Sequence, residues 1–329
     1  MRIDCGPIAY EWVDAWAAVP DPALAGTGWA HPGIQVTDAG EVVTFHPREP
    51  LVLVLGTDGS LLRSFPVRLG EGHGLRIDGD AVWIADPGGK SVLRPDGTLG
   101  DDGWGPAVAK YSLDGRELGR VERPPAEVYA DGGHYAPTDV AVDAATGDLW
   151  VTDGYGSSLV HKFDGDGRYL LSINGQEGGS PFDCPHSIAL DTRRGAPELY
   201  VADRGNARIQ VYGTDGTFRR TVGQGVLNSP SVFAFDGDHL IVGELYSRLA
   251  VLDGDDELVG YLGDNGAVTQ EPGWPNALDT EGRPVPTDRL QPGKFNSPHG
   301  LASDPDGNLY IAEWLLGGRY TKLAKQTGS

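Results

Sequence analysis

The chain has 329 residues, and 26 lysines and arginines stand against 47 aspartates and glutamates, which gives a formal net charge of −21. A surface of this charge repels phosphate backbones and anionic lipids, so nucleic acid and membranes are excluded as expected partners. Only Cys5 and Cys184 could form a disulfide, and no run of about 18 apolar residues occurs that could span a membrane. We therefore expect a cytoplasmic protein without a disulfide framework.

In chain order, six copies of one phrase follow one another, starting near residues 32, 72, 137, 185, 230 and 298. Each copy has a short apolar strand, a turn, a second strand, a third strand and then Asp-Gly, with room for a fourth strand. The strands are rich in β-branched and aromatic residues and lie between glycine- and proline-containing turns. Four strands repeated six times predict an all-β fold, a six-bladed β-propeller around a central channel, with residues 1–329 as a single domain.

Segments outside the regular copies have expected places. The last copy shows only three strands, so we predict that residues 10–16 supply its fourth strand and close the ring. We predict interblade loops at residues 101–136 and 264–297, either as lids over the channel entrance or as covers for blade edges. The second strands end in a repeated acid, which favours a turn-fixing role over catalysis; these acids are Asp86, Asp153, Asp203, Glu244 and Glu313.

Three histidines, His73, His186 and His299, stand at equal intervals of 113 residues, at the start of the first strand of the second, fourth and sixth copies. The first strands of a propeller line its channel, so the three imidazoles are expected to converge on the axis. Three imidazoles leave one tetrahedral position open, as in catalytic zinc sites, and we predict Zn²⁺ or another divalent metal here. A single histidine of this kind more often packs or hydrogen-bonds; the set of three carries the prediction.

Strand direction places further side chains at the channel entrance where the histidines lie, which we call the mouth. The second strand of each blade runs back toward this entrance, so the residues that follow it lie there. Tyr155 and Arg204 are candidates there for proton transfer and anion recognition. Trp314 places an indole at the mouth, and Glu244 with Arg248 places charge opposite it. We predict these last three as substrate-binding residues.

The segments 137–143, 146–147 and 151–155 resemble the lyase domain of peptidylglycine α-amidating enzymes, itself a six-bladed propeller of the NHL-repeat class. The likeness continues through 185–190 and 201–204, and it covers residues from about 70 to 325. That family cleaves the C–N bond of peptidyl α-hydroxyglycine and releases a peptide amide and glyoxylate. The resemblance implies that His73, His186 and His299 hold zinc, that Tyr155 removes the hydroxyl proton, and that Arg204 orients the substrate.

This sequence also departs from the family pattern. The acidic residue that follows the family's third histidine, and that is associated with a structural calcium, is Gly300 here, so the resemblance does not extend to calcium. A further arginine of the family's first blade has no match around His31 and Gly33, and the family's disulfide cysteines are absent.

The leading hypothesis is thus a monomeric, metal-dependent lyase that acts on an α-hydroxylated amide, either a small molecule or peptide-like. Two alternatives remain open. One is a metal-dependent propeller hydratase or lactone hydrolase, and the other is a non-catalytic NHL-repeat scaffold.

Overall fold

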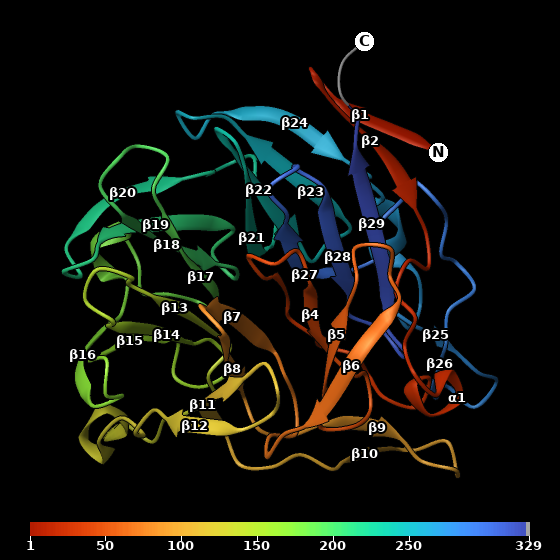
Figure 1. Ribbon diagram of the computed structural model, residues 1–329, viewed down its shortest axis with the longest axis horizontal. Helices are drawn as coiled ribbons and strands as arrows, with labels where there is room; N and C mark the ends of the chain where they lie inside the picture. Colours follow the sequence, from red (N-terminus) through yellow and green to blue (C-terminus); the bar gives the residue numbers. More distant parts are fainter. Residues whose placement is uncertain (327–329) are drawn as a thin grey trace.

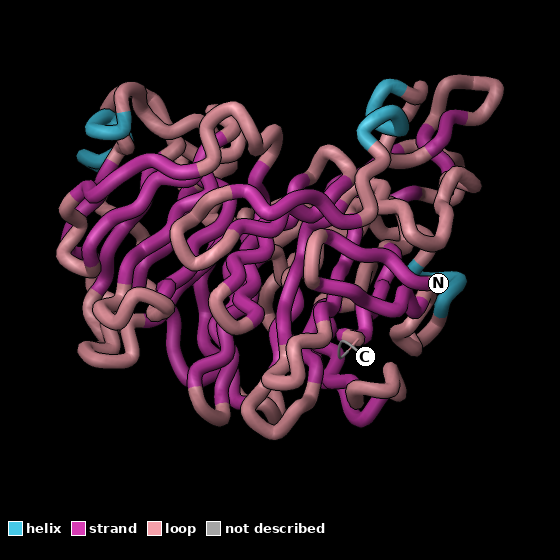
Figure 2. The backbone as a smooth tube through the Cα atoms, turned by 90° about the horizontal axis from the view of Figure 1, so that it is seen from above, coloured by secondary structure: helices cyan, strands magenta, loops and turns pink. Residues whose placement is uncertain are grey.

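Six antiparallel sheets, five of four strands and one of five, form a ring in the computed structural model, which describes residues 1–326 (Figure 1). Figure 2, turned by 90°, shows the strands crossing the thickness of this ring, with loops and short helices raised above one face. The prediction of a six-bladed β-propeller is therefore confirmed.

The blades take their strands in chain order from the channel outward, except in blade 6, and in blade 2 a separate hairpin lies between the second and third strands. Blades 1 to 3 are built from β3 (Ile34–Val36), β4 (Val42–Phe45), β5 (Leu51–Leu55) and β6 (Leu61–Pro66); β7 (Gly74–Asp78), β8 (Ala81–Asp86), β11 (Ala107–Ser112) and β12 (Glu117–Arg120); and β13 (Asp139–Val142), β14 (Leu149–Asp153), β15 (Leu159–Phe163) and β16 (Tyr169–Ile173). Blades 4 to 6 are built from β17 (Pro185–Asp191), β18 (Glu198–Asp203), β19 (Arg208–Gly213) and β20 (Phe218–Val222); β21 (Pro230–Asp236), β22 (His239–Glu244), β23 (Arg248–Leu252) and β24 (Leu258–Leu262); and β27 (Pro298–Ser303), β28 (Leu309–Glu313), β29 (Arg319–Lys325), β2 (Ile8–Val13) and β1 (Arg2–Cys5).

Short elements decorate the connections between these strands. They are α1 (Pro22–Ala25), the 3-10 helices η1 (Ala126–Tyr129), η2 (Gln176–Gly178) and η3 (Gly266–Gln270), and the two hairpins β9 (Ser91–Leu93) with β10 (Leu99–Asp101) and β25 (Ala277–Leu278) with β26 (Pro284–Val285). No helix within residues 1–326 is long and apolar enough to cross a membrane.

The ring closes through the N-terminal segment, as predicted. Strand β2 pairs antiparallel with β29, with Tyr10 opposite Lys325 and Val13 opposite Lys322. The pairing strand begins two residues earlier than expected, at Ile8, and β1 then adds a fifth strand at the outer edge. In Figure 1 the red N-terminal strands accordingly lie beside the blue C-terminal ones.

This closure has a measurable energetic consequence. Trp12 of β2 is 4% exposed, and its ring centroid lies 4.7 Å from that of Phe295. We expect Trp12→Ala to lower the free energy of unfolding by about 3 to 5 kcal/mol, because it removes a large buried side chain. Trp104→Ala, at a site that is 50% exposed, should change it by no more than about 0.5 kcal/mol. Denaturant unfolding measures both values, and equal effects of the two substitutions would contradict the closure.

The hydrophobic core is divided among the blade interfaces. Six clusters of buried side chains each join two neighbouring blades, and the cluster between blades 6 and 5 includes Trp12. Each blade is therefore held by its neighbours rather than by one central core. The channel at the axis stays free for polar side chains.

The repeated acids fix the entry of the inner strand in five of the six blades. Asp86, for example, accepts hydrogen bonds from the backbone N–H groups of Gly70 and Gly88. The other four also accept from backbone N–H groups that precede the inner strand of their own blade, namely Asp153 from Ala136, Asp203 from Asp183, Glu244 from Asn228 and Ser229, and Glu313 from Asn296 and Ser297. These contacts agree with the predicted turn-fixing role.

The expectation of one long loop over residues 101–136 was wrong. Strands β11 and β12 of blade 2 lie inside it, and β11 pairs with β8 from Ala107 to Ser112. The extra residues instead occupy 87–106, where the β9–β10 hairpin has its own Asp-Gly turn at Asp96, and 121–138 between blades 2 and 3. The second expected loop, 264–297, does connect blades 5 and 6 and carries the β25–β26 hairpin.

Candidate metal centre

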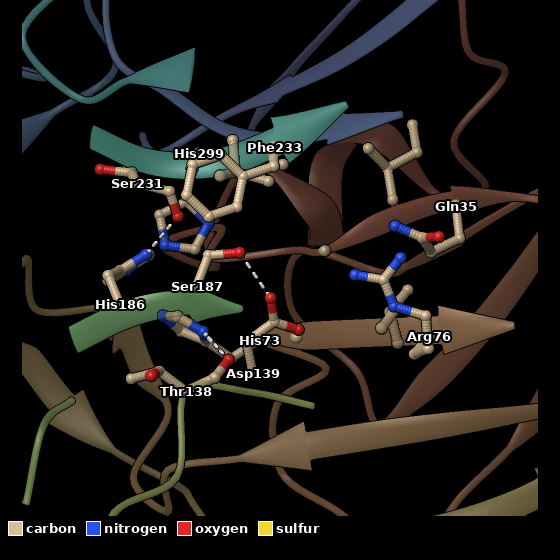
Figure 3. Close-up of a pocket in the computed structure, with 16 residues that line it drawn as sticks. Gln35, His73, Arg76, Thr138, Asp139, His186, Ser187, Ser231, Phe233 and His299 are labelled. Atoms are coloured by element: carbon tan, nitrogen blue, oxygen red, sulfur yellow. Dashed lines mark hydrogen bonds between the residues drawn. The ribbon is translucent and has the colours of Figure 1, made fainter. Parts of the chain in front are cut away.

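The three histidines meet at the axis (Figure 3). His186 and His299 lie in the inner strands β17 and β27, and His73 directly precedes β7. The potential ligand atoms of the three lie within 4.8 Å of one another, and this is the one such group of histidine, cysteine or acidic residues in the described part of the chain. The structure thus brings together the three residues that the equal spacing singled out.

Backbone carbonyl groups of the intervening blades orient two of the rings. His73 Nδ1 lies 2.7 Å from the carbonyl oxygen of Thr138, and His186 Nδ1 lies 2.7 Å from that of Ser231. A carbonyl only accepts, so each Nδ1 carries a proton and each Nε2 keeps its lone pair. This arrangement is the one in which histidine binds metals through Nε2.

His299 is 3% exposed, yet neither ring nitrogen has a hydrogen-bond partner among residues 1–326. The corresponding carbonyl group, that of Gly33, instead accepts from Thr44 Oγ1 at 2.8 Å. A buried polar group without a partner costs about 1 to 3 kcal/mol. The ring of His299 therefore has a vacant lone pair beside those of the other two.

Burial keeps all three imidazoles neutral. It lowers the pKa of His73 to about 3, and it lowers the pKa of His186 and His299 well below the usual value, with the nearby Arg204 guanidinium and the neighbouring histidines acting in the same direction. Neutral imidazole is the form that coordinates a metal ion.

Tyr155 directly adjoins this group. It follows β14, and its hydroxyl lies 3.2 Å from Nε2 of His73 and 3.0 Å from Nε2 of His186. Burial raises the pKa of Tyr155, and the nearby Arg204 guanidinium opposes that rise. The phenol is thus protonated at rest, and its hydroxyl lies at the Nε2 atoms of His73 and His186 that would bind a metal.

Arg204, which follows β18, stacks its guanidinium 5.4 Å from the ring centroid of Tyr155. It donates a hydrogen bond to Cys184 Sγ at 3.1 Å and makes no ion pair with an acidic side chain of residues 1–326. A half-buried guanidinium without a carboxylate partner leaves donors free for an anionic or carbonyl group. The structure therefore places both Tyr155 and Arg204 at the histidines.

A fourth histidine and a buried ion pair were missed by the sequence reasoning. The ring of His31 lies 5.6 Å from that of His73 and 5.1 Å from that of His299. Its Nδ1 lies 3.5 Å from Glu71 Oε1, which also accepts from Lys90 Nζ at 2.7 Å. Burial alone would raise the pKa of Glu71, but the charges of Lys90 and His31 hold it at about 2.

Trp314 lies in an aromatic cluster at the edge of the mouth. Its ring is 5.4 Å from that of His31, 5.3 Å from that of Trp29 and 5.9 Å from that of Trp274, which in turn lies 5.7 Å from the exposed Tyr246. The predicted substrate-binding tryptophan is therefore separated from His299 by the single ring of His31.

Glu244 and Arg248 have a different environment from the one expected. Glu244 is fully buried and accepts from the backbone of Asn228 and Ser229 and from Arg248 Nε. The guanidinium of Arg248 lies 3.8 Å from the ring centroid of Tyr261. The pair stabilises blade 5 and is not brought to the histidines, so we do not assign substrate binding to it.

The channel next to the histidines is narrow, and the guanidinium of Arg76 already lines it. Its cavity measures about 20 Å³, which is room for about one water molecule. Arg76 donates to the carbonyl groups of Val140 and Ile188. Arg76 and Asp139 both line this channel (Figure 3); burial raises the pKa of Asp139, and the charge of Arg76 opposes the rise. A Cβ on Gly300 would lie 2.5 Å from the carbonyl oxygen of Pro32, so a carboxylate has no room at that position.

The residues present fit a divalent metal. Three neutral imidazoles converge, two of them with orienting carbonyls behind the ring, and the third has no other partner. Zinc and related divalent ions accept such a donor set, and a three-histidine site keeps one position for substrate. His73, His186 and His299 would hold the ion, with Tyr155 and Arg204 beside it.

Fold and repeat together define the class of protein. A family model described as the NHL repeat matches residues 135–163. With six blades in a ring, the chain is a six-bladed β-propeller that contains an NHL repeat.

Within this class, the chain is similar to the peptidylglycine α-amidating proteins. It is 30% identical over 251 residues to peptidylglycine alpha-amidating monooxygenase of Rattus norvegicus. The aligned region covers 73% of this chain and 22% of the rat protein. It is 29% identical over 256 residues to a probable peptidyl-alpha-hydroxyglycine alpha-amidating lyase of Caenorhabditis elegans, covering 73% and 60%. NHL repeat-containing protein 3 of Mus musculus is 30% identical over 233 residues, covering 62% and 58%. The chain thus spans about a fifth of the rat relative and about three-fifths of the other two.

Solved structures share the fold at lower identity. A gluconolactonase of Xanthomonas campestris has a TM-score of 0.59 at 16% identity, covering 99% of this chain and 94% of that chain. A streptogramin B lyase has a TM-score of 0.56 at 14% identity, covering 96% and 98%. At these identities the likeness shows the shared fold alone.

Proposed function

We propose that the protein is a metal-dependent lyase that cleaves the C–N bond of an α-hydroxylated amide. The observation that carries the proposal is the meeting of the Tyr155 hydroxyl with Nε2 of His73 and His186, at 3.2 and 3.0 Å, beside the unpartnered ring of His299. The amidating-lyase relatives support the same reaction class.

Each residue has a chemical task in this proposal. A divalent ion held by the three imidazoles would supply a Lewis acid toward a substrate oxygen. Tyr155 stands where its oxygen can take the proton of the substrate hydroxyl and give its own proton to the amide nitrogen. The C–N bond then breaks with its electron pair on nitrogen, the former hydroxyl carbon becomes an aldehyde, and the amide is released. Arg204 would orient the substrate and stabilise negative charge that develops on oxygen.

The experiment compares two substrates on one preparation. N-Acetyl α-hydroxyglycine should release glyoxylate, removal of the metal with a chelator should abolish the release, and added Zn²⁺ should restore it. Opening of a lactone with no release of glyoxylate would reject the lyase in favour of a hydrolase. If the protein contains no divalent metal and takes up none, the non-catalytic scaffold is favoured instead.

A further inference from the structure

A second cavity, of about 550 Å³, opens beside Tyr155 between blades 2 and 3. Its walls come from the 87–106 segment that follows β8 and from the 121–136 segment that precedes β13. Tyr155 links this cavity to the histidines, because the residue lines the cavity and its hydroxyl contacts His73 and His186. A group in the cavity would therefore lie one side chain away from the reacting atoms.

The wall that carries Trp104 has a tightly packed backbone. A Cβ on Gly103 would lie 2.1 Å from Gly89 Cα, and a Cβ on Gly70 would lie 2.9 Å from the Trp104 backbone nitrogen. The N–H of Gly89 donates to the carbonyl of Trp104 at 3.3 Å. The backbone of Trp104 is therefore held from two sides, and its side chain projects from a fixed base.

The indole of Trp104 is nevertheless 50% exposed and lines the cavity. All eight tryptophans lie in the described part of the chain, and Trp104 is the most exposed of them. A second aromatic ring, that of Tyr135, lines the same cavity and is itself buried. An exposed indole on a fixed backbone, in a cavity that a second aromatic residue also lines, is typical of a site that stacks a planar ligand.

The charges of the cavity disfavour a cationic ligand. Arg123 lies 5.9 Å from the Tyr135 ring centroid and makes no ion pair or side-chain hydrogen bond within residues 1–326. Asp101 also lines the cavity, but its Oδ1 accepts from the backbone N–H groups of Lys90 and Gly103, both at 2.8 Å. The guanidinium of Arg123 is thus free to contact a ligand, while the carboxylate of Asp101 is already hydrogen-bonded.

We propose that this cavity binds an aromatic acyl group of the substrate, with its ring against Trp104. The inference rests on the proposed function, because the acyl group is the part joined to the amide nitrogen that Tyr155 would protonate. The opposite side of the histidines offers no alternative, since the channel there measures only about 20 Å³. The substrate class is therefore an N-aroyl or N-arylacyl derivative of α-hydroxyglycine rather than one with a small acyl group.

Binding of two unreactive probes tests the cavity. N-Phenylacetylglycine and N-acetylglycine lack the α-hydroxyl group and differ by one phenyl ring. The parent protein should bind the phenylacetyl probe about tenfold more tightly, the usual scale of an aromatic contact together with its buried area. Trp104→Ala should remove the preference. Tyr246→Ala, at an aromatic side chain that is 46% exposed on the other side of the mouth, should retain it.

The outcomes separate the cavity from the reaction. Equal binding of the two probes by the parent, or loss of the preference in Tyr246→Ala instead of Trp104→Ala, would overturn the aromatic subsite. A retained, Trp104-dependent preference without release of glyoxylate from either N-acyl α-hydroxyglycine would uphold the subsite and reject the lyase. Where the lyase is active, kcat/KM for the phenylacetyl substrate should fall about tenfold in Trp104→Ala while that for the acetyl substrate stays unchanged.

Discussion

His299→Ala is expected to abolish the divalent-metal binding that we propose for the three histidines. Each of the three imidazoles supplies one ligand, and loss of an outer-shell partner alone typically costs 10- to 100-fold in metal affinity, so loss of a ligand should cost at least about 100-fold. Metal content of the purified variants measures the effect. His239→Ala is the matched control, because His239 begins β22 at the opposite end of the strand from the mouth, and it should leave the metal content unchanged.

A stability measurement separates metal binding from packing. In the metal-free protein the buried ring of His299 has two nitrogens without partners, each costing about 1 to 3 kcal/mol. His299→Leu should therefore cost no stability in the absence of metal. With metal present, the parent should gain about 4 kcal/mol at a metal concentration 1,000 times its dissociation constant, and the variant should gain none. Equal destabilisation by His299→Leu with and without metal would show a packing role and contradict the metal site.

The blade pattern could be predicted from sequence because the strands repeat with the same acid, turn and Asp-Gly features. The same features give a wrong prediction for the third and fourth strands of blade 2. Its inserted β9–β10 hairpin carries an Asp-Gly turn at Asp96 that imitates the end of a third strand, whereas the true third strand, β11, contains small alanines and Lys110. A local pattern cannot distinguish an inserted hairpin from a blade strand, because only pairing with β8 defines the blade.

The centre of the site could be predicted to a similar extent. Equal spacing identified His73, His186 and His299, and strand direction placed Tyr155 and Arg204 on their face. The carbonyl groups of Thr138 and Ser231 could not be found in this way, because every residue has a backbone carbonyl and only the fold aims these two at an imidazole.

His31 had a weak signal, since it precedes Pro32, whereas the second, fourth and sixth copies have histidine after proline or glycine. The reversed order puts the ring in the connection before β3 rather than on the inner strand, yet it still reaches His73 and His299. Its partners Glu71 and Lys90 come from two further segments, so no sequence motif joins the three.

Tyr155→Phe is expected to leave the metal content unchanged and to slow turnover of N-acetyl α-hydroxyglycine at least about 100-fold, the lower end of the loss when a general acid or base is removed. Phenylalanine keeps the ring that Arg204 stacks on at 5.4 Å, so the substitution removes the hydroxyl and little else. Tyr246→Phe, at the exposed tyrosine across the mouth, is the control and should turn over substrate at the parent rate.

The way in which the rate falls identifies what the hydroxyl does. Equal losses in kcat and kcat/KM would mean that the hydroxyl acts in the transition state, as proton transfer requires, whereas a raised KM with unchanged kcat would mean that it only binds substrate. A drop in metal content would mean instead that the hydroxyl, which lies 3.2 and 3.0 Å from Nε2 of His73 and His186, helps to hold the ion. Only the first pattern is compatible with Tyr155 carrying the proton from the hydroxyl oxygen to the amide nitrogen.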